Sequence, residues 1–208
     1  TYNNDDIESV ELDTNTNTLR TCNLGDSGLL VFRKNDNGGI ELMHETTSTT
    51  QGFNFPRQIG NIGDPLLGKM KSDTSADAIF QEFPLVEGDV SIAATDGILD
   101  NLYNHDLCCI LSNSNLFIKP KSNNHTNNST NTTIATDNTD EKPQTKDIEL
   151  DLDQVAQDII SLALKKSTSE KVKTPWSESV VAHYPAEKGY LGGKPDDMTV
   201  IVSKYISK

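Results

Sequence analysis

Three short apolar runs separated by turn residues limit most strongly what the first half of this chain can fold into. The runs cover residues 19–24, 29–33 and 40–43, and each has the length of a β-strand. Gly-Asp-Ser-Gly separates the first two runs, and Asn-Gly-Gly precedes the third. Turn sequences of this kind between apolar runs favour hairpins. The pattern therefore predicts an antiparallel meander.

Two later segments predict further strands. They are GDVSIAATDG at residues 88–97 and DDMTVIVSKYI at residues 196–206. In both segments the apolar residues occupy both parities, which is typical of a strand whose two faces are covered. We therefore expect these strands to lie inside a sandwich.

Two helices are also predicted. The shorter covers residues 101–111, and the longer begins at Asp151, where Asp151 and Gln154 are placed as a capping box. Apolar residues follow at helical spacing in the longer helix, namely Leu152, Val155, Ile159 and Leu162. Strands in one part of the chain and helices around them predict an α+β layered domain.

A polar tract interrupts this pattern. Residues 122–147 consist almost entirely of Asn, Thr, Asp and Lys, and bury too little apolar surface to offset the entropy cost of ordering. We interpret the tract as a disordered insertion, at about residues 113–147, in a domain that covers residues 19–208. Residues 1–18 are also rich in Asn, Asp and Thr, and predict a shorter polar segment of the same kind.

Charge and cysteine content exclude several classes of function. The net charge is −13, from 31 acidic and 18 basic residues, so the chain repels nucleic-acid phosphates and anionic lipid. No apolar stretch reaches the roughly 20 residues that span a bilayer. We therefore expect no nucleic-acid partner and no membrane association. The three cysteines form no CxxC pair, which predicts neither a zinc site nor a disulfide framework and favours an intracellular, reducing compartment.

Several acids share one context, the end of a predicted strand or turn beside a glycine or a second acid. They are Asp26, Asp96 and the pair Asp196 and Asp197, and Asp100 follows Asp96 by four residues. Carboxylate oxygens are the ligands that Mg²⁺ and Mn²⁺ prefer. Asp-Gly and Asp-Ser-Gly are also ordinary turn sequences in which the acid binds nothing. Spacing alone leaves both interpretations open.

The order of four motifs adds a resemblance to a known family. The chain resembles the C-terminal two-thirds of a metal-dependent protein phosphatase of the 2C family, and is most similar to the branch that contains mitochondrial and plastid members. The resemblance covers about residues 19–208 apart from the polar insertion. It rests on NLGDSGLLVFR (23–33), FNFPRQIG (53–60), EGDVSIAATDGILDNLYNHDL (87–107) and TPWSESVVAHYPAEKGYLGGKPDDMTVIVS (174–203).

The resemblance implies a fold and an activity. The fold is a four-layer αββα sandwich whose N-terminal part is missing, and the activity is hydrolysis of phosphoserine and phosphothreonine by a metal-bound hydroxide. The implied partners are a phosphorylated protein substrate and two core ions of Mn²⁺ or Mg²⁺, with a third, looser ion in several members. The family also suggests a monomer, in mitochondria or otherwise in the cytoplasm.

The resemblance assigns roles to six residues. Asp96 and Asp196 match acids that hold the core metal pair. Asp26 and Asp100 match acids that, with Asp96, bind the further ion. Gly97 and Asp197 are supporting residues, and Asp197 stands where many relatives carry Asn.

The chain also departs from the family pattern. The first family motif, a DG-GG stretch whose Asp bridges both metals, is absent, and so is the basic residue upstream of it that contacts phosphate. The chain is therefore expected to be either a fragment of a longer phosphatase or a non-catalytic binding module that kept the fold. The retention of Asp96 and Asp196 favours the fragment, which would expose a sheet edge liable to self-association. A calcium-binding domain is disfavoured because no 12-residue loop with alternating ligands occurs.

Overall fold

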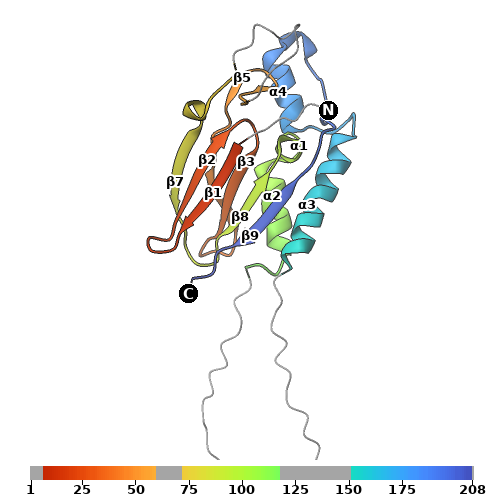
Figure 1. The fold of residues 1–208 in the computed structure, drawn as a ribbon. Coiled ribbons are helices and arrows are strands. Elements are labelled where there is room, and N and C mark those ends of the chain that lie inside the picture. Colours follow the sequence, from red (N-terminus) through yellow and green to blue (C-terminus); the bar gives the residue numbers. More distant parts are fainter. Residues whose placement is uncertain (1–6, 60–71, 118–150, 208) are drawn as a thin grey trace, which may run out of the picture.

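Two antiparallel sheets lie face to face, and helices cover the outer face of one of them (Figure 1). The computed structural model describes residues 7–59, 72–117 and 151–207. The first sheet has the strand order β1-β2-β7, the second has the order β4-β3-β8-β9, and β5 and β6 form a small hairpin. This arrangement confirms the predicted α+β sandwich. Within the described residues the helices cover only the second sheet.

The strands are β1 (Ile7–Asp13), β2 (Thr18–Leu24), β3 (Gly28–Lys34), β4 (Ile40–Glu45), β5 (Thr50–Gly52), β6 (Phe55–Pro56), β7 (Ile79–Pro84), β8 (Val90–Ala94) and β9 (Val200–Lys204). The helices are α1 (Asp96–Leu99), α2 (Asn104–Asn113), α3 (Leu152–Ser167) and α4 (Pro175–His183), with short 3₁₀ turns η1 (Ser75–Asp77) and η2 (Pro185–Glu187).

Strand β3 lies between two apolar layers. Leu29 and Val31 pack toward the first sheet, whereas Leu30 and Phe32 pack toward the helices, and all four are buried. Residues of alternate parity in a strand point to opposite faces, so a strand covered on both sides needs apolar residues at every position. Burial of both parities, which was expected for the strands at 88–97 and 196–206, thus occurs in β3.

The larger part of the core lies between the second sheet and the helices. Val90 and Ile92 of β8 pack there against Leu107 of α2 and against Val155 and Ile159 of α3. Helix α3 begins as predicted, because the side chain of Asp151 accepts a hydrogen bond from the backbone N–H of Gln154 (2.9 Å). The Gln154 side chain donates to Asp158 instead of closing the capping box. No helix among residues 7–59, 72–117 and 151–207 is long and apolar enough to cross a membrane.

Three expectations about the elements are wrong. Strands β2 and β3 do not pair, because the Gly25–Gly28 turn carries the chain from one sheet to the other. The helix expected at 101–111 begins at Asn104, after the separate turn α1, because the Asn101 side chain is bonded to other segments of the chain. Strand β9 was expected to be covered on both faces, but its Ile201 is 62% exposed.

The polar segments need a further correction. Residues 7–13 of the expected polar segment 1–18 form β1, which pairs with β2 from Ile7–Leu24 to Asp13–Thr18. Residues 113–117, expected at the start of the insertion, belong to the domain, since Leu116 is fully buried in the core. Residues 118–150, which hold the rest of the expected insertion, lie outside the described residues.

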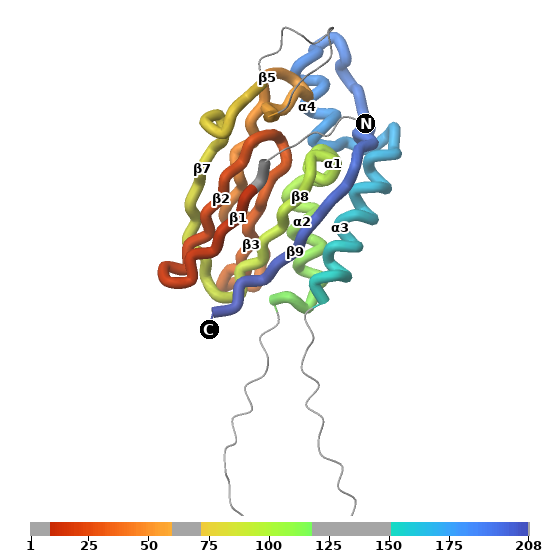
Figure 2. The backbone as a smooth tube through the Cα atoms, in the orientation of Figure 1, coloured from red at the N-terminus to blue at the C-terminus, as the bar shows by residue number. Residues whose placement is uncertain are grey.

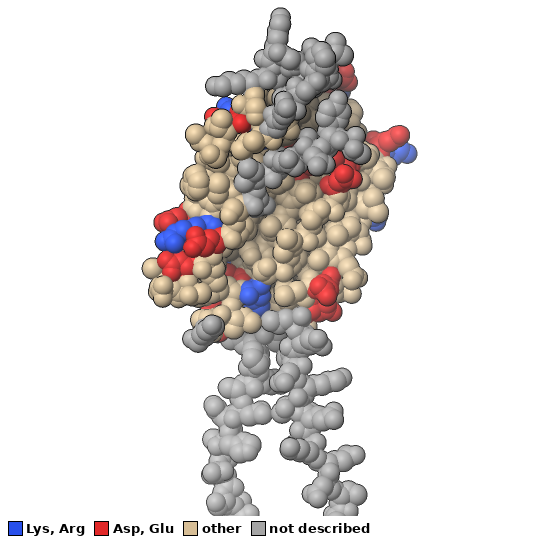
Figure 3. Space-filling model, in the orientation of Figure 1, with Lys and Arg blue, Asp and Glu red and all other residues tan. Residues whose placement is uncertain are grey.

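One side of the sandwich is open between β1 and β9. His44 of β4 stacks on Phe83 of β7, so these two strands share one side, and β1 and β9 are the outer strands on the other. Val10, Leu12 and Ile201 pair with residues of the inner faces, yet they are 46%, 41% and 62% exposed. The surface in Figure 3, which shows this side, carries few charged side chains. The self-association expected from the sequence would occur here.

Asp73 joins the β5–β6 hairpin to the chain that leads into β7. Its carboxylate accepts hydrogen bonds from Arg57 Nη1 (2.7 Å), from the backbone N–H of Gln58 (2.9 Å) and from Gln51 Nε2 (2.6 Å). Burial alone would raise the pKa of Asp73, but these hydrogen bonds outweigh it and lower the pKa. The ionised carboxylate therefore stabilises the folded state above its unfolded pKa of about 3.9.

Replacing Asp73 with Asn is expected to lower the Tm at pH 7 by about 5 °C, because the charge-assisted bonds are lost. This difference from the wild type should shrink as the pH falls below about 3.9 and the wild-type carboxylate becomes protonated. Thermal melts of both proteins between pH 7 and pH 2 measure it. A deficit that is equally large at both ends of this range would contradict the assignment.

Candidate metal centre

The ends of three strands bring the predicted acids to one edge of the second sheet. Antiparallel pairing places Gly28 of β3 and Val200 of β9 on either side of Ala94, the last residue of β8. The segments that precede β3 and β9 therefore meet the segment that follows β8. Figure 2 shows α1 at the end of β8, beside the chain that enters β9. Acids far apart in the sequence become neighbours at this edge.

Three of the acids converge on the side chain of Lys194. The Lys194 Nζ atom lies 2.6 Å from Asp96 Oδ2, 2.9 Å from Asp100 Oδ2 and 3.1 Å from Asp196 Oδ2. We call these four residues the acid cluster. Three negative charges thus face one positive charge, and the lysine side chain is only 14% exposed. The structure confirms that these three acids lie together.

Asp26 lies at the same edge of the sheet. It occupies the turn before β3, and extending the β3–β8 register by two residues from the Gly28–Ala94 pair brings Asp26 level with Asp96. Its side chain is partly buried. The placement suits the predicted role of Asp26 as a ligand of a further ion, which stays a prediction.

Asn101 holds the loop that carries Lys194. Its side-chain Nδ2 donates to the backbone oxygens of Gly97 (2.9 Å) and Lys194 (2.8 Å), and its Oδ1 accepts from the backbone N–H of Lys194 (3.0 Å). Asn101 is fully buried. Because an amide side chain can both donate and accept, one residue fixes the two segments against each other. The position of the acid cluster therefore depends on Asn101.

Gly97 allows the Asp196–Asp197 segment to approach α1. A Cβ atom at this position would lie 2.2 Å from the backbone oxygen of Asp197, far inside van der Waals contact. The same oxygen accepts a hydrogen bond from the Thr95 hydroxyl (3.1 Å). Both residues predicted to be supporting, Gly97 and Asp197, thus lie beside the acids and fix their backbone.

Burial and like charge act on Asp100. Burial raises the pKa of this carboxyl, the hydrogen bond from Lys194 opposes the shift, and the charges of Asp96 and Asp196 add to it. For Lys194 burial opposes the charged form, but the bonds to Asp96 and Asp100 outweigh it and raise the pKa. Three adjacent carboxylates repel one another, and the ammonium group of Lys194 offsets this repulsion.

Aromatic side chains border the acid cluster. Lys194 Nζ lies 5.3 Å from the centroid of the Trp176 ring, within the range of a cation–π contact. The backbone N–H of Trp176 donates to the backbone oxygen of Asp100 (2.8 Å), and Phe53 stacks on the Trp176 ring at 5.2 Å. Phe53 comes from the FNFP motif, so that motif also lies close to the cluster. Trp176 thus packs against Phe53.

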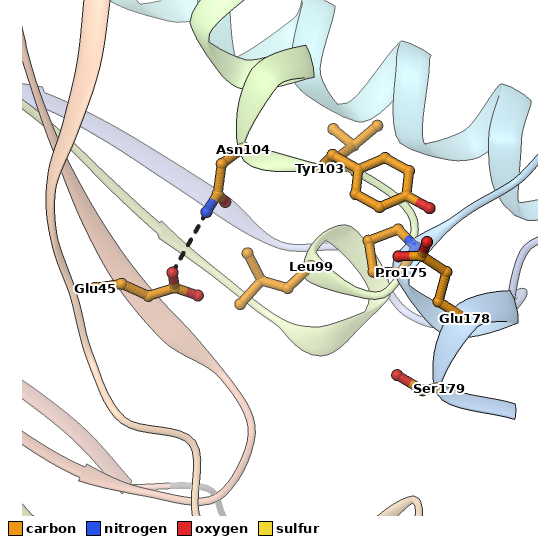
Figure 4. Close-up of a pocket in the computed structure, with 8 residues that line it drawn as sticks. Glu45, Leu99, Tyr103, Asn104, Pro175, Glu178 and Ser179 are labelled. Carbon is orange, nitrogen blue, oxygen red and sulfur yellow. Dashed lines mark hydrogen bonds between the residues drawn. The ribbon is translucent and has the colours of Figure 1, made fainter. Parts of the chain in front are cut away.

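A pocket of about 320 Å³ lies beside α1, and no residue of the acid cluster lines it (Figure 4). Leu99 and Tyr103 face it, and Asn104 donates to Glu45 across one side (3.4 Å). The Glu178 carboxylate, on α4, lies on the opposite side and pairs with Lys173. The charged groups of this pocket are thus already paired.

The donor set of the acid cluster fits a divalent metal. Among residues 7–59, 72–117 and 151–207, no group of three or more His, Cys, Asp or Glu side chains is arranged to hold a metal ion. The Nζ atom of Lys194 lies among the three acids. Yet all three acids offer an oxygen to one common cation, and oxygen ligands of this kind suit Mg²⁺ and Mn²⁺. The oxygen atoms of the acid cluster are therefore chemically suited to bind a cation.

Comparison with known proteins decides the family. No family model matches the chain. Over 186 residues the chain is 31% identical to a probable protein phosphatase 2C of rice (Oryza sativa subsp. japonica), BIPP2C1. This match covers 89% of this chain and 24% of the rice protein. The chain belongs to the protein phosphatase 2C family. The human protein phosphatase PTC7 homolog is 28% identical over 196 residues, 93% of this chain and 51% of the human protein.

A solved phosphatase shows the same fold. The photosystem II phosphatase PBCP superposes with a TM-score of 0.66 at 23% identity, over 96% of this chain and 63% of that protein. The chain spans about half of the human relative and about a quarter of the rice relative named above. The likeness to PBCP supports the sandwich of this family.

Two residues of the site were not predicted from the sequence. Lys194 and Asn101 both lie inside the family motifs, as the Lys of GGKPDD and the Asn of TDGILDN. For Asn101, the only sign in the sequence is its position directly after Asp100. The lysine carries no signal, because a lone Lys beside two acids is usually a solvated residue.

Proposed function

We propose that the protein containing this chain is a metal-dependent serine/threonine phosphatase that acts on phosphorylated proteins. The convergence of Asp96, Asp100 and Asp196 on a single cation is the observation that supports this most directly. The names of the rice and human relatives, both protein phosphatases, agree with it. The retained acids disfavour a non-catalytic binding module.

Asp96 and Asp196 would hold the core Mn²⁺ or Mg²⁺ ions, and Asp100 and Asp26 a further one. When bound, such ions polarise a phosphoryl oxygen and lower the pKa of a bound water, which makes direct hydrolysis feasible. The chain's own part is to keep the carboxylates ionised and oriented. Asn101 fixes the loop that carries Asp196, and Gly97 lets that loop lie against α1.

A reducing compartment inside the cell is the proposed location. All three cysteines are free, which suits a reducing intracellular compartment, and mitochondria are one such place. The partner is proposed to be a phosphorylated protein, and the enzyme a monomer.

Phosphate release tests the proposal. The full-length protein is incubated with a phosphothreonine peptide, in Mn²⁺ and in a chelator. We expect release in Mn²⁺ and none in the chelator. Release that is equal in both conditions, or absent in both, would contradict a metal-dependent phosphatase.

A further inference from the structure

The backbone of Lys194 is fixed by Asn101, and its side chain enters the acid cluster with its ammonium group. Asn101 bonds to both the N–H and the carbonyl oxygen of Lys194, and Pro195 follows with a restricted φ. The polar contacts of the side chain are made by its terminal ammonium group, with the three carboxylates and the Trp176 ring. Because the four-carbon stem of a lysine is flexible, rotation about its bonds can move the ammonium group without moving the backbone.

The ammonium group donates hydrogen bonds to Asp96 and Asp100 and forms an ion pair with Asp196. An ammonium has three donors, and three carboxylate oxygens lie within 3.1 Å of Nζ. The oxygens that it occupies are those that a metal ion would need. A divalent ion among the same oxygens would be repelled by the ammonium group, because both are cations at short distance.

We propose that Lys194 is a built-in competitor of the metal. It neutralises the acid cluster in the metal-free protein, keeps the three carboxylates assembled, and is displaced when a divalent ion binds. The proposal rests on the metal site proposed above. It makes Lys194 a positioning residue that sets the metal concentration at which the site fills.

The only tryptophan of the chain reports on this displacement. Trp176 lies 5.3 Å from Lys194 Nζ, and a cation near an indole ring changes its emission. If the ammonium leaves as metal enters, the fluorescence of Trp176 should change in step with metal occupancy. Mg²⁺ is a suitable probe because it is diamagnetic and does not itself quench the indole.

Replacing Lys194 with Met removes the charge and retains most of the volume. Isothermal titration of the full-length protein with Mg²⁺ is expected to give a Kd at least about tenfold lower for Lys194→Met than for the wild type, which corresponds to about 1.4 kcal/mol. The metal-free variant should melt at a lower temperature than the wild type, and added Mg²⁺ should recover most of the difference. Trp176 fluorescence should respond to Mg²⁺ in the wild type and much less in the variant.

Lys166→Met is the matched control. Lys166 Nζ also pairs with one aspartate, Asp106 (2.6 Å), lies 5.6 Å from the Tyr103 ring, and is 17% exposed. Its partner is outside the acid cluster, so its removal should leave the Kd for Mg²⁺ unchanged within about twofold while costing a similar loss of stability.

Each outcome decides between the two proposals. Tighter Mg²⁺ binding by Lys194→Met alone supports displacement. An unchanged or weaker affinity overturns the competitor role and leaves the metal site intact. An absence of Mg²⁺ binding by both proteins contradicts the metal site and the competitor role together. If Lys194→Met does not fold, Lys194→Gln and the wild-type fluorescence titration remain, and a wild-type signal that stays flat while Mg²⁺ binds overturns displacement.

Discussion

Replacing Asp96 with Asn in the full-length protein is expected to lower metal-dependent phosphate release by at least about a hundredfold. Even the outer partners of metal ligands cost roughly 10–100-fold when they are replaced, so the loss of a ligand charge should cost at least as much. The substitution preserves volume and a partial acceptor, so the fold should remain. Circular dichroism and thermal melting check the fold, and a phosphothreonine-peptide assay in Mn²⁺ measures the rate.

A matched control for Asp96→Asn is Asp158→Asn. Asp158 is exposed on α3 and accepts a hydrogen bond only from Gln154 (2.9 Å), so it shares no partner with the acid cluster. It should leave the rate unchanged. Activity of Asp96→Asn within a few-fold of the wild type would refute the assignment of that residue.

Replacing Gly97 with Ala is expected to destabilise the protein by about 3 kcal/mol, because overpacking a fixed site forces the backbone to move. The added Cβ would lie 2.2 Å from the Asp197 backbone oxygen, and this oxygen belongs to the loop that Asn101 holds. For a chain of this size the Tm should fall by about 6–12 °C. The same displacement should weaken Mg²⁺ binding, since it moves Asp196.

Gly52→Ala provides the comparison for Gly97→Ala. A Cβ at Gly52 meets nothing within 4 Å, and the backbone there is not in the left-handed region. This variant should melt within about 1–2 °C of the wild type. Equal melting temperatures for the two variants would show that the contact at Gly97 is relieved without cost.

The sequence predicted the individual strands better than their pairing. The runs at β3, β4, β8 and β9 are apolar and bounded by turn residues, so local patterning is enough to find them. Whether β2 and β3 pair depends on the path of the Gly25–Gly28 turn, which local composition does not determine. The two strands belong to different sheets, because β2 pairs with β7 whereas β3 pairs with β8.

The acids of the site could also be predicted, but their partners could not. Asp96 and Asp196 stand in short motifs at strand ends, and strand ends at one edge of a sheet are neighbours. The role of Asn101 depends on contacts 93 residues away in the sequence, with the Lys194 backbone. Side-chain hydrogen bonds between such distant positions leave no periodic trace in the sequence. Lys194 likewise contacts Asp96 and Asp100, which lie more than 90 residues away in the sequence.

Direct measurement of Mn²⁺ binding tests the central claim, that the acids around Lys194 form a metal centre. The EPR signal of free Mn²⁺ is recorded while the full-length protein, or its double variant Asp96→Asn, Asp196→Asn, is added in excess. The claim predicts that the wild type removes the free Mn²⁺ signal and that the double variant leaves it nearly intact. A wild type that leaves all Mn²⁺ free, or a double variant that binds it equally well, would contradict the claim.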